Sequence, residues 1–509
     1  MVNDTYTNGF WWEQRWFLAL LVVASVVPLM WPSVPPLVDL PGHMGRYAVE
    51  LDATSPILSQ WYDFRWRLIG NSGVDLLIVP MARVFGLELG VKLIILAIPA
   101  MTTAGFLLIA REVHGRVPPT AFFALPLAYG HPFLFGFVNF ALGVAFTLLA
   151  FALWLRMTRL RRTRWRSAVF SVIACVIWVT HTFAWGLLGV LCLAAEIIRQ
   201  RDLGHLWHTA VFRAGIACLP MALPLIPMVV WQSQTRSSTG DWFDLKEKSH
   251  YLATTLRDRW QVFDVGALAL IFGVVLMPLV VDRLGYSRML IGSTFFLIIV
   301  FFTLPRVIFG SAYADMRLTP FLFANAVIAI RPLPGVSRRL LNGLAILGLL
   351  FVGARTASTT ASFAIVSARW DRALIALDHL PRGARVAAFT PWTCAFDWST
   401  DRMDHLPGLA IVRRQAFSND QWQVSGTSFM TVTKSDAAGF VADPSQLVTE
   451  QPCHFGNWRS LDQSLAKLPR AAFDYVWLID PPRYDRRLTF GMTPVWANGT
   501  DRLYRIDRK

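Results

Sequence analysis

Ionisable and amide side chains with the capacity for chemistry gather in short motifs between apolar segments. The first motif is Val38-Asp-Leu-Pro-Gly-His-Met-Gly-Arg46, in which Asp39 and His43 are one helical turn apart. A carboxylate can act as general base toward a hydroxyl or an amine. Arginine can hold a phosphate and stabilise the charge that it gains on leaving. The motif therefore predicts a site in which Asp39 and His43 are catalytic and Arg46 binds substrate.

Further polar residues lie in other segments that the topology described below places on the same side of a membrane. Polar groups near a bilayer are costly, so a cluster of them on one side is a functional signal. We predict that the following residues bind substrate: Trp66, Asn71, Asp75, His131, Asn139, His181, Asp315 and Arg317.

Each of these residues also has a structural interpretation. Asp39 is well placed to cap a helix that starts near Pro41, a role that does not exclude chemistry. His43 could be an ordinary surface histidine. The other structural alternatives are helix capping by Asn71 and Asp75, a carbonyl contact of His181 at a helix end, a local ion pair of Asp315 with Arg317, and interface anchoring by Arg46 and Trp66.

The composition identifies the elements that must position these residues. The chain has 509 residues, of which 54% are apolar and 16% charged, and its mean hydropathy is +0.44. Soluble domains have about 45–50% apolar and about 25% charged residues. The sequence therefore predicts a mainly α polytopic membrane protein and excludes a cytosolic enzyme, a disordered protein and a disulfide scaffold. The net charge is +15. Orientation in the membrane is sufficient to account for the basic inner loops, recruitment of anionic lipid stays open, and no nucleic-acid partner is expected.

Apolar runs mark the membrane-spanning segments. A spanning helix needs about 20 mostly apolar residues, and this criterion gives roughly eleven candidates. They lie near 17–37, 91–110, 119–131, 137–155, 167–181, 184–198, 214–231, 265–281, 290–304, 318–330 and 340–356.

Arginine in short loops predicts the orientation. The densest run lies at 156–166, which should be cytoplasmic. Counting outward from it places four other basic loops and the N-terminus inside, and everything after about residue 356 outside. The segment 73–90 is apolar enough to be a span; we expect a re-entrant or juxtamembrane helix there.

The predicted organisation has two domains. Residues 1–356 form the transmembrane domain with a long first outer loop at 38–90, and residues 357–509 form an extracytoplasmic soluble α/β domain. Short β-like runs start at Arg385 and Tyr475, and a turn at Asn498 precedes a closing strand. An oxidising exterior would permit Cys394 and Cys453 to pair, which the sequence leaves open.

The outer location restricts the chemistry. Nucleotide sugars are absent outside the cell, so a glycosyl donor there should be linked to a polyprenyl phosphate or diphosphate, whose tail needs a groove between helices. The sequence has no P-loop, no GxGxxG and no zinc-type spacing. A divalent metal stays open without any ligand spacing in its favour.

Four local patterns resemble a bacterial group of GT-C-like membrane proteins, within the GT-C type of integral membrane glycosyltransferases. They are Asp39-Leu-Pro-Gly-His43, the series Tyr62, Trp66, Asn71 and Asp75, the element from Lys92 to Arg111, and Asp315-Met-Arg317 before a proline-containing helix. The resemblance covers the membrane part. It implies a GT-C-like architecture in the bacterial inner membrane, with Asp39 where the family has its catalytic base.

The sequence departs from one branch of that type. Leu40 follows Asp39, where the protein-mannosyltransferase-like branch has Asp-Glu, so the substrate and metal use of that branch are not carried over. We expect an enzyme that moves a sugar from a polyprenyl-phosphate-linked donor to a glycan, lipid or protein acceptor, with membrane lipid around it.

Two other functions compete with this one. One is an O-antigen-ligase-like enzyme, for which an outer Arg/His pair could come from Arg306, Arg317, His131 and His181. The other is a non-enzymatic transporter or a scaffold for envelope polysaccharide assembly. Transporters place polar groups near the midplane in broken helices related by a repeat, and no repeat is evident here.

Overall fold

The computed structural model describes residues 9–232, 239–308, 310–422, 428–453 and 458–508. The predicted cytoplasmic N-terminus at 1–8 lies outside these residues. The chain divides into two compact units. The first, here called the helical unit, comprises Met1–Trp31, Leu68–Leu76 and Ile94–Ala361. The second, the sheet unit, comprises Pro32–Arg67, Leu77–Leu93 and Ser362–Lys509.

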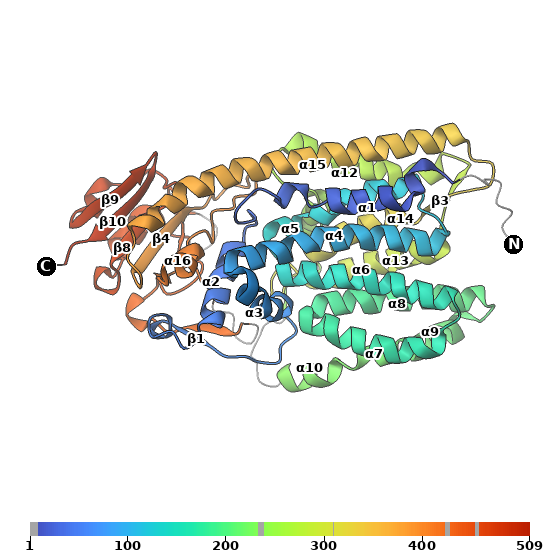
Figure 1. Ribbon diagram of the computed structural model, residues 1–509, viewed down its shortest axis with the longest axis horizontal. Helices are drawn as coiled ribbons and strands as arrows, with labels where there is room; N and C mark the ends of the chain where they lie inside the picture. Colours follow the sequence, from blue (N-terminus) through green and yellow to red (C-terminus); the bar gives the residue numbers. More distant parts are fainter. Residues whose placement is uncertain (1–8, 233–238, 309, 423–427, 454–457, 509) are drawn as a thin grey trace. The chain divides into compact units, whose positions relative to one another are not determined.

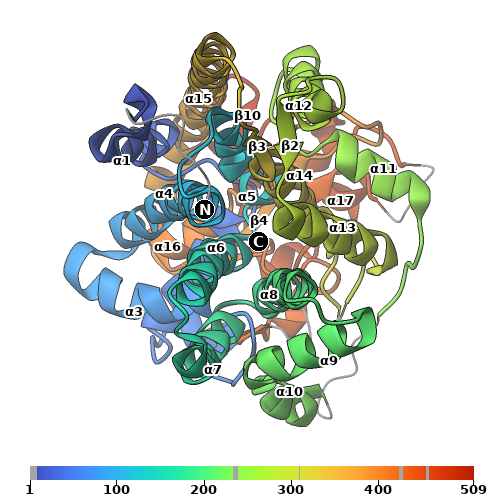
Figure 2. The same ribbon diagram turned by 90° about the vertical axis from the view of Figure 1, so that its right-hand side faces the viewer.

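The helical unit is a bundle in which α6 contacts α7 and α8, α8 contacts α9 and α13, and α13 contacts α14 (Figures 1 and 2). Its core is a cluster of buried apolar side chains from these helices. A short antiparallel pair of strands, β2 (Leu284–Tyr286) and β3 (Ile330–Pro332), joins two of its loops. The helices that lie wholly in the unit are α1 (Arg15–Ala24), α5 (His131–Phe135), α6 (Val138–Arg159), α7 (Thr163–Thr180), α8 (Thr182–Asp202), α9 (Trp207–Cys218), α10 (Leu225–Gln232), α11 (Leu245–Ala253), α12 (Gln261–Leu276), α13 (Arg288–Thr303) and α14 (Thr319–Ile328).

Five helices of the described chain are long and apolar enough to cross a membrane. They coincide with five of the predicted spans and identify a multi-pass membrane protein. They are α4 (Leu87–His114), α6, α8, the segment Gln261–Leu279 that includes α12, and the segment Arg338–His379 that begins with α15 (Arg338–Leu374).

The prediction of eleven spans is not confirmed, because several apolar runs form shorter helices. The run at 119–131 is a 3₁₀ helix over Pro119–Tyr129, with a second proline at Pro126, followed by α5. The run at 214–231 is divided between α9 and α10 by a 3₁₀ turn. The ten residues of α14 rise about 15 Å, half of a hydrocarbon core of about 30 Å. Hydropathy locates apolar segments but does not give the length of the helices within them.

Helix α15 continues well past the predicted domain boundary at 356. The stretch after Gly353 is rich in Ala, Ser and Thr, which lowers its hydropathy. Alanine is the strongest helix former, so the helix persists to Leu374 after the apolar run has ended. The two compact units divide within this helix, at Ala361 and Ser362.

The sheet unit is built on a six-stranded mixed sheet in the order β5-β4-β8-β10-β9, with β7 also paired to β4. Strand β4 is parallel to β5, β7 and β8, whereas β10 is antiparallel to β8 and β9. All three predicted strand runs are strands here. The bounds are β4 (Arg385–Pro391), β5 (Phe417–Ser418), β7 (Leu447–Val448), β8 (Tyr475–Leu478), β9 (Met492–Asn498) and β10 (Asp501–Ile506).

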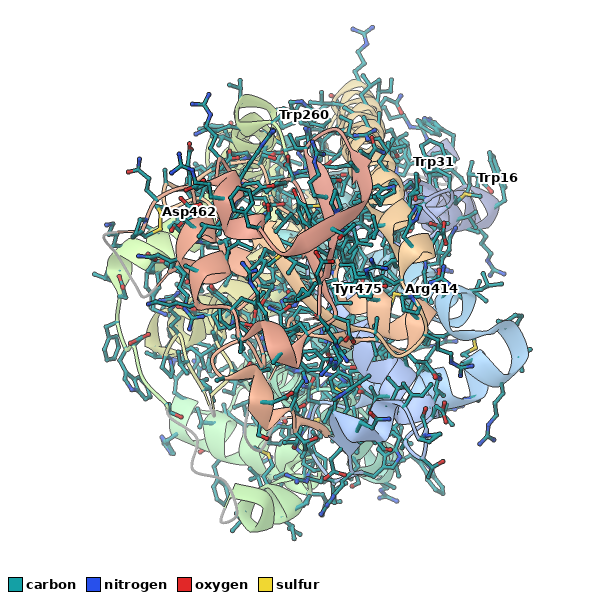
Figure 3. All side chains as sticks on the ribbon, turned by 90° about the vertical axis from the view of Figure 1, so that its left-hand side faces the viewer. Trp16, Trp31, Trp260, Arg414, Asp462 and Tyr475 are labelled. Carbon is teal, nitrogen blue, oxygen red and sulfur yellow. A yellow bond between two sulfur atoms is a disulfide. The ribbon has the colours of Figure 1, made fainter. Side chains whose placement is uncertain are left out.

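Two short helices accompany the sheet. They are α16 (Gly408–Arg414) and α17 (Leu461–Lys467), the latter with a capping box between Ser460 and Gln463. Figure 3 shows the side chains of this unit, with Asp462 in α17 and Tyr475 at the start of β8. A disulfide joins Cys394 to Cys453, so the pairing that the sequence left open is present.

The first predicted outer loop belongs largely to the sheet unit. Its strand β1 (Tyr62–Phe64) pairs with β6 (Met430–Val432). Its helix α2 (Leu40–Leu51) packs on α16. The approach is close because both helices carry glycine at the contact: a Cβ on Gly408 would lie 2.6 Å from the carbonyl oxygen of Pro41. The loop also includes most of α3 (Gly73–Phe85), whose first turn lies in the helical unit.

Candidate functional site

Asp39 occupies the N-cap position of α2, but its side chain makes no capping hydrogen bond. The carboxylate is therefore not used as a cap, although the sequence favours it for that role. Asp39 is 8% exposed, and the amide of His43 donates to its carbonyl oxygen at 3.0 Å. The two side chains are thus one helical turn apart, as their spacing predicts.

A row of three rings in tilted contact connects α2 to the C-terminal part of the sheet unit. The rings of His43 and Trp422 have centroids 4.9 Å apart, and those of Trp422 and His405 are 4.1 Å apart. A Cβ on Gly42 would lie 2.7 Å from the Trp422 ring, so only glycine leaves room for the stack. His43 is therefore held against residues that lie about 360 positions further along the chain.

Several carboxylates surround His405. Its Nδ1 lies 3.0 Å from the carbonyl oxygen of Asp420 and 3.8 Å from the Oδ2 of the same residue, and its Nε2 lies 3.9 Å from Asp443 Oδ1. Burial disfavours the charged imidazole. The interactions with Asp420, Asp443 and Asp39 outweigh burial and raise the pKa of His405 to about 9. His405 is consequently a cation at neutral pH.

At Asp404 the neutral form is favoured, whereas at His405 the charged form is favoured. Burial and the nearby carboxylates of Asp401, Asp39 and Asp443 raise its pKa well above the ordinary value, and the charge of His405 offsets this only in part. A cluster in which the pKa values of an acid and of an imidazole are both shifted by the same neighbours has the composition of an acid–base site. We name Asp39, His43, Asp404, His405 and Asp443 the α2 cluster.

The sequence reasoning missed the members of this cluster that come from the C-terminal region. Asp404 and His405 are adjacent in the sequence, and Asp420-Gln-Trp422 follows after α16. The available signal was Asp401-Arg-Met-Asp-His405, a run rich in ionisable residues between two β-like segments. The run alone does not indicate a position beside α2, because that contact depends on the packing of α2 on α16.

Two other predicted residues of the first loop lie in the sheet unit. Arg46 is buried in α2 with its guanidinium 5.3 Å from the centre of the Tyr47 ring. Trp66 is 49% exposed and its ring contacts those of Phe64 and Phe429. An exposed aromatic side chain of this kind fits interface anchoring as well as substrate binding.

Three predicted residues of the helical unit form one buried network at the start of α3. Asn139 accepts a hydrogen bond from the Val74 amide at 2.6 Å and donates to Asp75 Oδ2 at 2.9 Å. It also donates to the carbonyl oxygen of Asn71 at 3.0 Å. The network caps α3 from a neighbouring helix, so a structural role accounts for these contacts.

His181 and Arg317 meet in the helical unit. His181 Nδ1 accepts a hydrogen bond from the Phe183 amide at 3.1 Å, which in the neutral ring places the proton on Nε2. That nitrogen lies 3.5 Å from Arg317 Nη1, so two donors face each other. The Arg317 guanidinium also lies over the rings of Phe137 and Phe183. An acceptor oxygen bridging the two nitrogens would satisfy both donors.

Asp315 pairs with Lys248, a residue that the sequence reasoning did not single out. Lys248 Nζ donates to Asp315 Oδ2 at 2.7 Å and to the carbonyl oxygens of Phe301 and Leu304, both at 2.8 Å. The ammonium group thus has three acceptors, one for each of its protons. This arrangement anchors α11 to the end of α13.

His131 is buried at the start of α5, where its amide donates to the carbonyl oxygen of Thr255 and its ring meets Phe135 edge-on. No group of three or more His, Cys, Asp or Glu side chains among the described residues is arranged to hold a metal ion.

The predicted residues thus fall into separate groups. Asp39, His43, Arg46 and Trp66 belong to the sheet unit. Asn71, Asp75, His131, Asn139, His181, Asp315 and Arg317 belong to the helical unit. Within the helical unit, hydrogen bonds join Asn71, Asp75 and Asn139, and a second contact joins His181 to Arg317.

The helical bundle joined to a β-rich unit has a GT-C-like fold. Particular structures that share it are those of ArnT from Cupriavidus metallidurans, a GT-C glycosyltransferase, crystallised bound to undecaprenyl phosphate and in the apo state. Both have a TM-score of 0.50 and cover 96% of this chain and 97% of their own, at 14% and 13% identity. No family model matches the sequence, and neither does any curated protein.

Proposed function

We propose that the chain is a membrane glycosyltransferase that moves a sugar from a polyprenyl-phosphate-linked donor to an acceptor hydroxyl or amine. Asp39 acts as general base. The reaction takes place on the extracytoplasmic side of the bacterial inner membrane, with the N-terminus in the cytoplasm and the sheet unit outside.

The observation that carries the proposal is the state of Asp39. Its side chain is buried at the first turn of α2, makes no capping hydrogen bond, and interacts electrostatically with His405 and Asp404, whose pKa values are both raised. A carboxylate in such surroundings can take the proton of an acceptor hydroxyl as the new glycosidic bond forms. Before this transfer, the positive charge of His405 balances the negative charge of the Asp39 carboxylate.

The fold supports the choice of donor. A chain of this fold has been crystallised with undecaprenyl phosphate, the type of lipid that would leave when a polyprenyl-phosphate sugar is transferred. The apolar helices of the bundle supply the surroundings that a long isoprenoid tail needs. Because fold alone does not fix function, this support is by analogy.

The pair His181 and Arg317 supports a phosphate site. Both present N–H groups to one point, where a phosphate oxygen could accept from both nitrogens. A guanidinium that already lies over aromatic rings retains its positive charge at any physiological pH. We assign to Arg317 and His181 the role of binding the leaving phosphate.

The test is transfer from an undecaprenyl-phosphate-linked sugar by the purified full chain in nanodiscs, with release of undecaprenyl phosphate as readout. Asp39→Asn should lower turnover by about 10²–10⁴-fold, the usual contribution of a general base, and should retain binding of undecaprenyl phosphate. Arg317→Met should instead weaken binding of that lipid.

Asp63→Asn is the matched control, because Asp63 lies in the same loop, pairs with Arg65 and is substantially exposed. It should transfer sugar at the wild-type rate. If Asp39→Asn is as active as Asp63→Asn, Asp39 is not the base. If the wild-type chain binds the lipid and transfers none of the sugars offered, a scaffold or transporter is the better description.

A further inference from the structure

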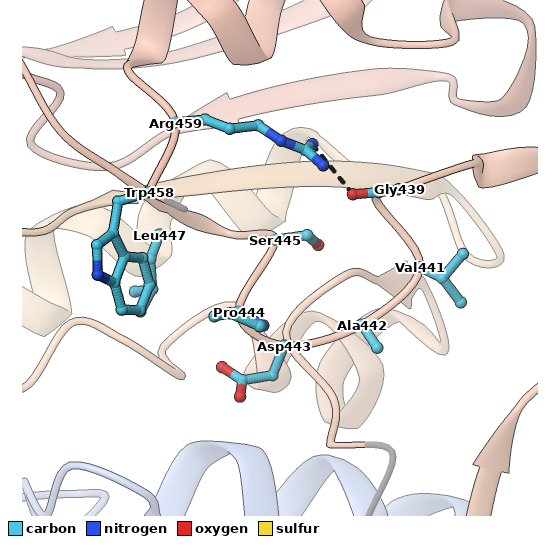
Figure 4. Close-up of a pocket in the computed structure, with 9 residues that line it drawn as sticks. All are labelled: Gly439, Val441, Ala442, Asp443, Pro444, Ser445, Leu447, Trp458 and Arg459. Atoms are coloured by element: carbon cyan, nitrogen blue, oxygen red, sulfur yellow. Dashed lines mark hydrogen bonds between the residues drawn. The ribbon is translucent and has the colours of Figure 1, made fainter. Parts of the chain in front are cut away.

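The sheet unit contains a cavity of about 310 Å³ that the proposed function does not use. Figure 4 shows Arg459 reaching across it toward Gly439, with Trp458 on one side and Asp443 below. Its volume is at the lower end of the range for small-molecule sites, about 300–1,000 Å³. A single sugar ring is a ligand of that scale.

The lining of this cavity combines an aromatic plane with charged groups. Trp458 supplies an indole, Leu447 and Val441 supply apolar surface, and Asp443 and Arg459 supply a carboxylate and a guanidinium. A pyranose has the complementary character: its axial C–H groups form an apolar face that packs on the electron-rich face of an aromatic ring. Its hydroxyls both donate and accept hydrogen bonds, so they could donate to the Asp443 carboxylate and accept from the Arg459 guanidinium.

The aromatic side of the cavity is firmly held. Trp458 stacks on Trp392, with ring centroids 5.3 Å apart and an interplanar angle of 26°. The Trp392 amide donates to the Val448 carbonyl oxygen at 2.7 Å, and the disulfide joins the two segments that carry the tryptophans. Both indoles remain half-buried. A half-buried pair fixed in this way is preorganised, which lowers the entropic cost of binding.

Asp443 connects the cavity to the α2 cluster. Its carboxylate lines the cavity, accepts a hydrogen bond from Gln446 at 2.8 Å and lies 3.9 Å from His405 Nε2. The His405 ring in turn contacts the Trp422 ring, which contacts the His43 ring. All of these residues belong to one compact unit, so their arrangement is a property of that unit.

We infer that this cavity binds a sugar ring of the acceptor, and hence that the acceptor is a carbohydrate. That the bound sugar belongs to an acceptor rests on the proposed function. That the cavity binds a sugar rests on the cavity alone. Trp458 provides the stacking plane, and Asp443 and Arg459 provide hydrogen bonds. Asp443 also belongs to the α2 cluster, so a ring bound here contacts a member of that cluster.

The test measures binding separately from transfer. Full-length protein in nanodiscs is titrated with the methyl glycosides of glucose, galactose, mannose and N-acetylglucosamine, and saturation-transfer NMR reports which ring protons contact the protein. At least one glycoside should bind through one face of its ring. Trp458→Ala should weaken that binding about tenfold or more, and Asp443→Asn should weaken it as well.

Trp398→Ala is the matched control: it removes another half-buried tryptophan of the same unit that does not line the cavity, and it should bind like the wild type. Trp458→Phe retains an aromatic plane and should restore most of the binding, which separates loss of contact from misfolding. The inference is overturned if no glycoside binds, or if Trp398→Ala weakens binding as much as Trp458→Ala does.

Asp39→Asn distinguishes this inference from the proposed function. It should bind the glycoside like the wild type while losing transfer. Glycoside binding without any transfer by the wild type would remove the enzymatic function and leave the sugar site. Transfer to a peptide or lipid, unaffected by Trp458→Ala, would retain the enzyme and reject a carbohydrate acceptor.

Discussion

Buried charged side chains have different kinds of partners in the two units. In the helical unit three buried cations are matched to carboxylates at short distance, whereas the buried Arg317 faces His181. The pairs are Lys248 with Asp315 at 2.7 Å, Arg355 with Asp264 at 2.6 Å and Arg166 with Glu196 at 3.2 Å. In the sheet unit one imidazole, His405, is surrounded by the carboxylates of Asp39, Asp404, Asp420 and Asp443.

The consequence of this difference is chemical. A matched buried pair has its charges and hydrogen bonds satisfied, so it holds helices in register and has little capacity to exchange a proton. In the group of acids around His405 the pKa values are displaced from their ordinary range: that of Asp404 is raised by burial and by like charges, and that of His405 is raised to about 9. Such a group holds protons that a reaction can use. Unmatched charge therefore marks the better candidate for the catalytic centre.

The largest expected effect concerns a matched pair. Lys248→Met removes the ammonium group and leaves Asp315 buried beside the carbonyl oxygens at the end of α13. Breaking a buried pair on one side costs about 3–5 kcal/mol. The unfolding temperature in detergent should fall markedly.

Lys246→Met is the control, since Lys246 lies in the same helix and is exposed. It should change the unfolding temperature little. Adding Asp315→Asn to Lys248→Met should recover part of the loss, because the unpaired charge is then removed. Equal effects of the two lysine substitutions would contradict the view that this pair is structural.

The second expectation concerns the unmatched cluster and its pH dependence. The pKa of His405 is raised from the ordinary 6.5 to about 9 in the folded chain. Its stabilising contribution is therefore complete below pH 6.5 and is lost as the pH rises through 9. The raised pKa of Asp404 acts in the same direction, since the protonated acid favours the folded state. The histidine alone contributes up to about 3 kcal/mol.

Unfolding temperatures measured between pH 6 and 9.5 test this. The wild type should lose stability across that interval, and His405→Gln should show a smaller slope. His379→Gln replaces an exposed histidine of the same unit and should retain the wild-type slope. A slope that is identical in all three proteins would show that His405 is not charged.

Much of the fold follows from patterns in the sequence. Hydropathy located the five long apolar helices, and alternation between β-like runs and turns located β4, β8 and β10. Both patterns are local, since the period of the side chains is set by the element itself. The end of α15 was missed because alanine-rich helix has low hydropathy.

The site could be predicted only in part, because it joins distant segments. The spacing of Asp39 and His43 fixed them on one turn of α2. Nothing in the sequence indicated that the ring of Trp422 would contact both His43 and His405. These contacts depend on the packing of α2 against α16. The first outer loop therefore folds with the C-terminal region, which a division of the sequence by hydropathy does not reveal.

The packing of α2 on α16 leads to a third prediction, with a smaller expected loss of stability. In Gly408→Ala the new methyl group would lie 2.6 Å from the Pro41 carbonyl oxygen and 3.0 Å from Asp420 Oδ2. Overpacking of this kind costs about 1–3 kcal/mol and would displace the first turn of α2, so transfer should fall along with the unfolding temperature. Gly353→Ala, where the added Cβ meets open space, should affect neither. A fully active Gly408→Ala protein would separate the α2–α16 contact from the chemistry.

The smallest effect is expected for a matched pair that lies at the surface of the sheet unit. Arg413 donates Nε and Nη2 to the two carboxylate oxygens of Glu88 at 2.9 and 3.0 Å, and both side chains are about one-third exposed. Water and salt screen such a pair, so Arg413→Met should cost less than about 1 kcal/mol despite the two-pronged geometry. The loss should shrink further at high salt. A loss as large as that of Lys248→Met would mean that pairing, rather than burial, determines the energetic importance of charge in this chain, and the contrast between the two units would then need another cause.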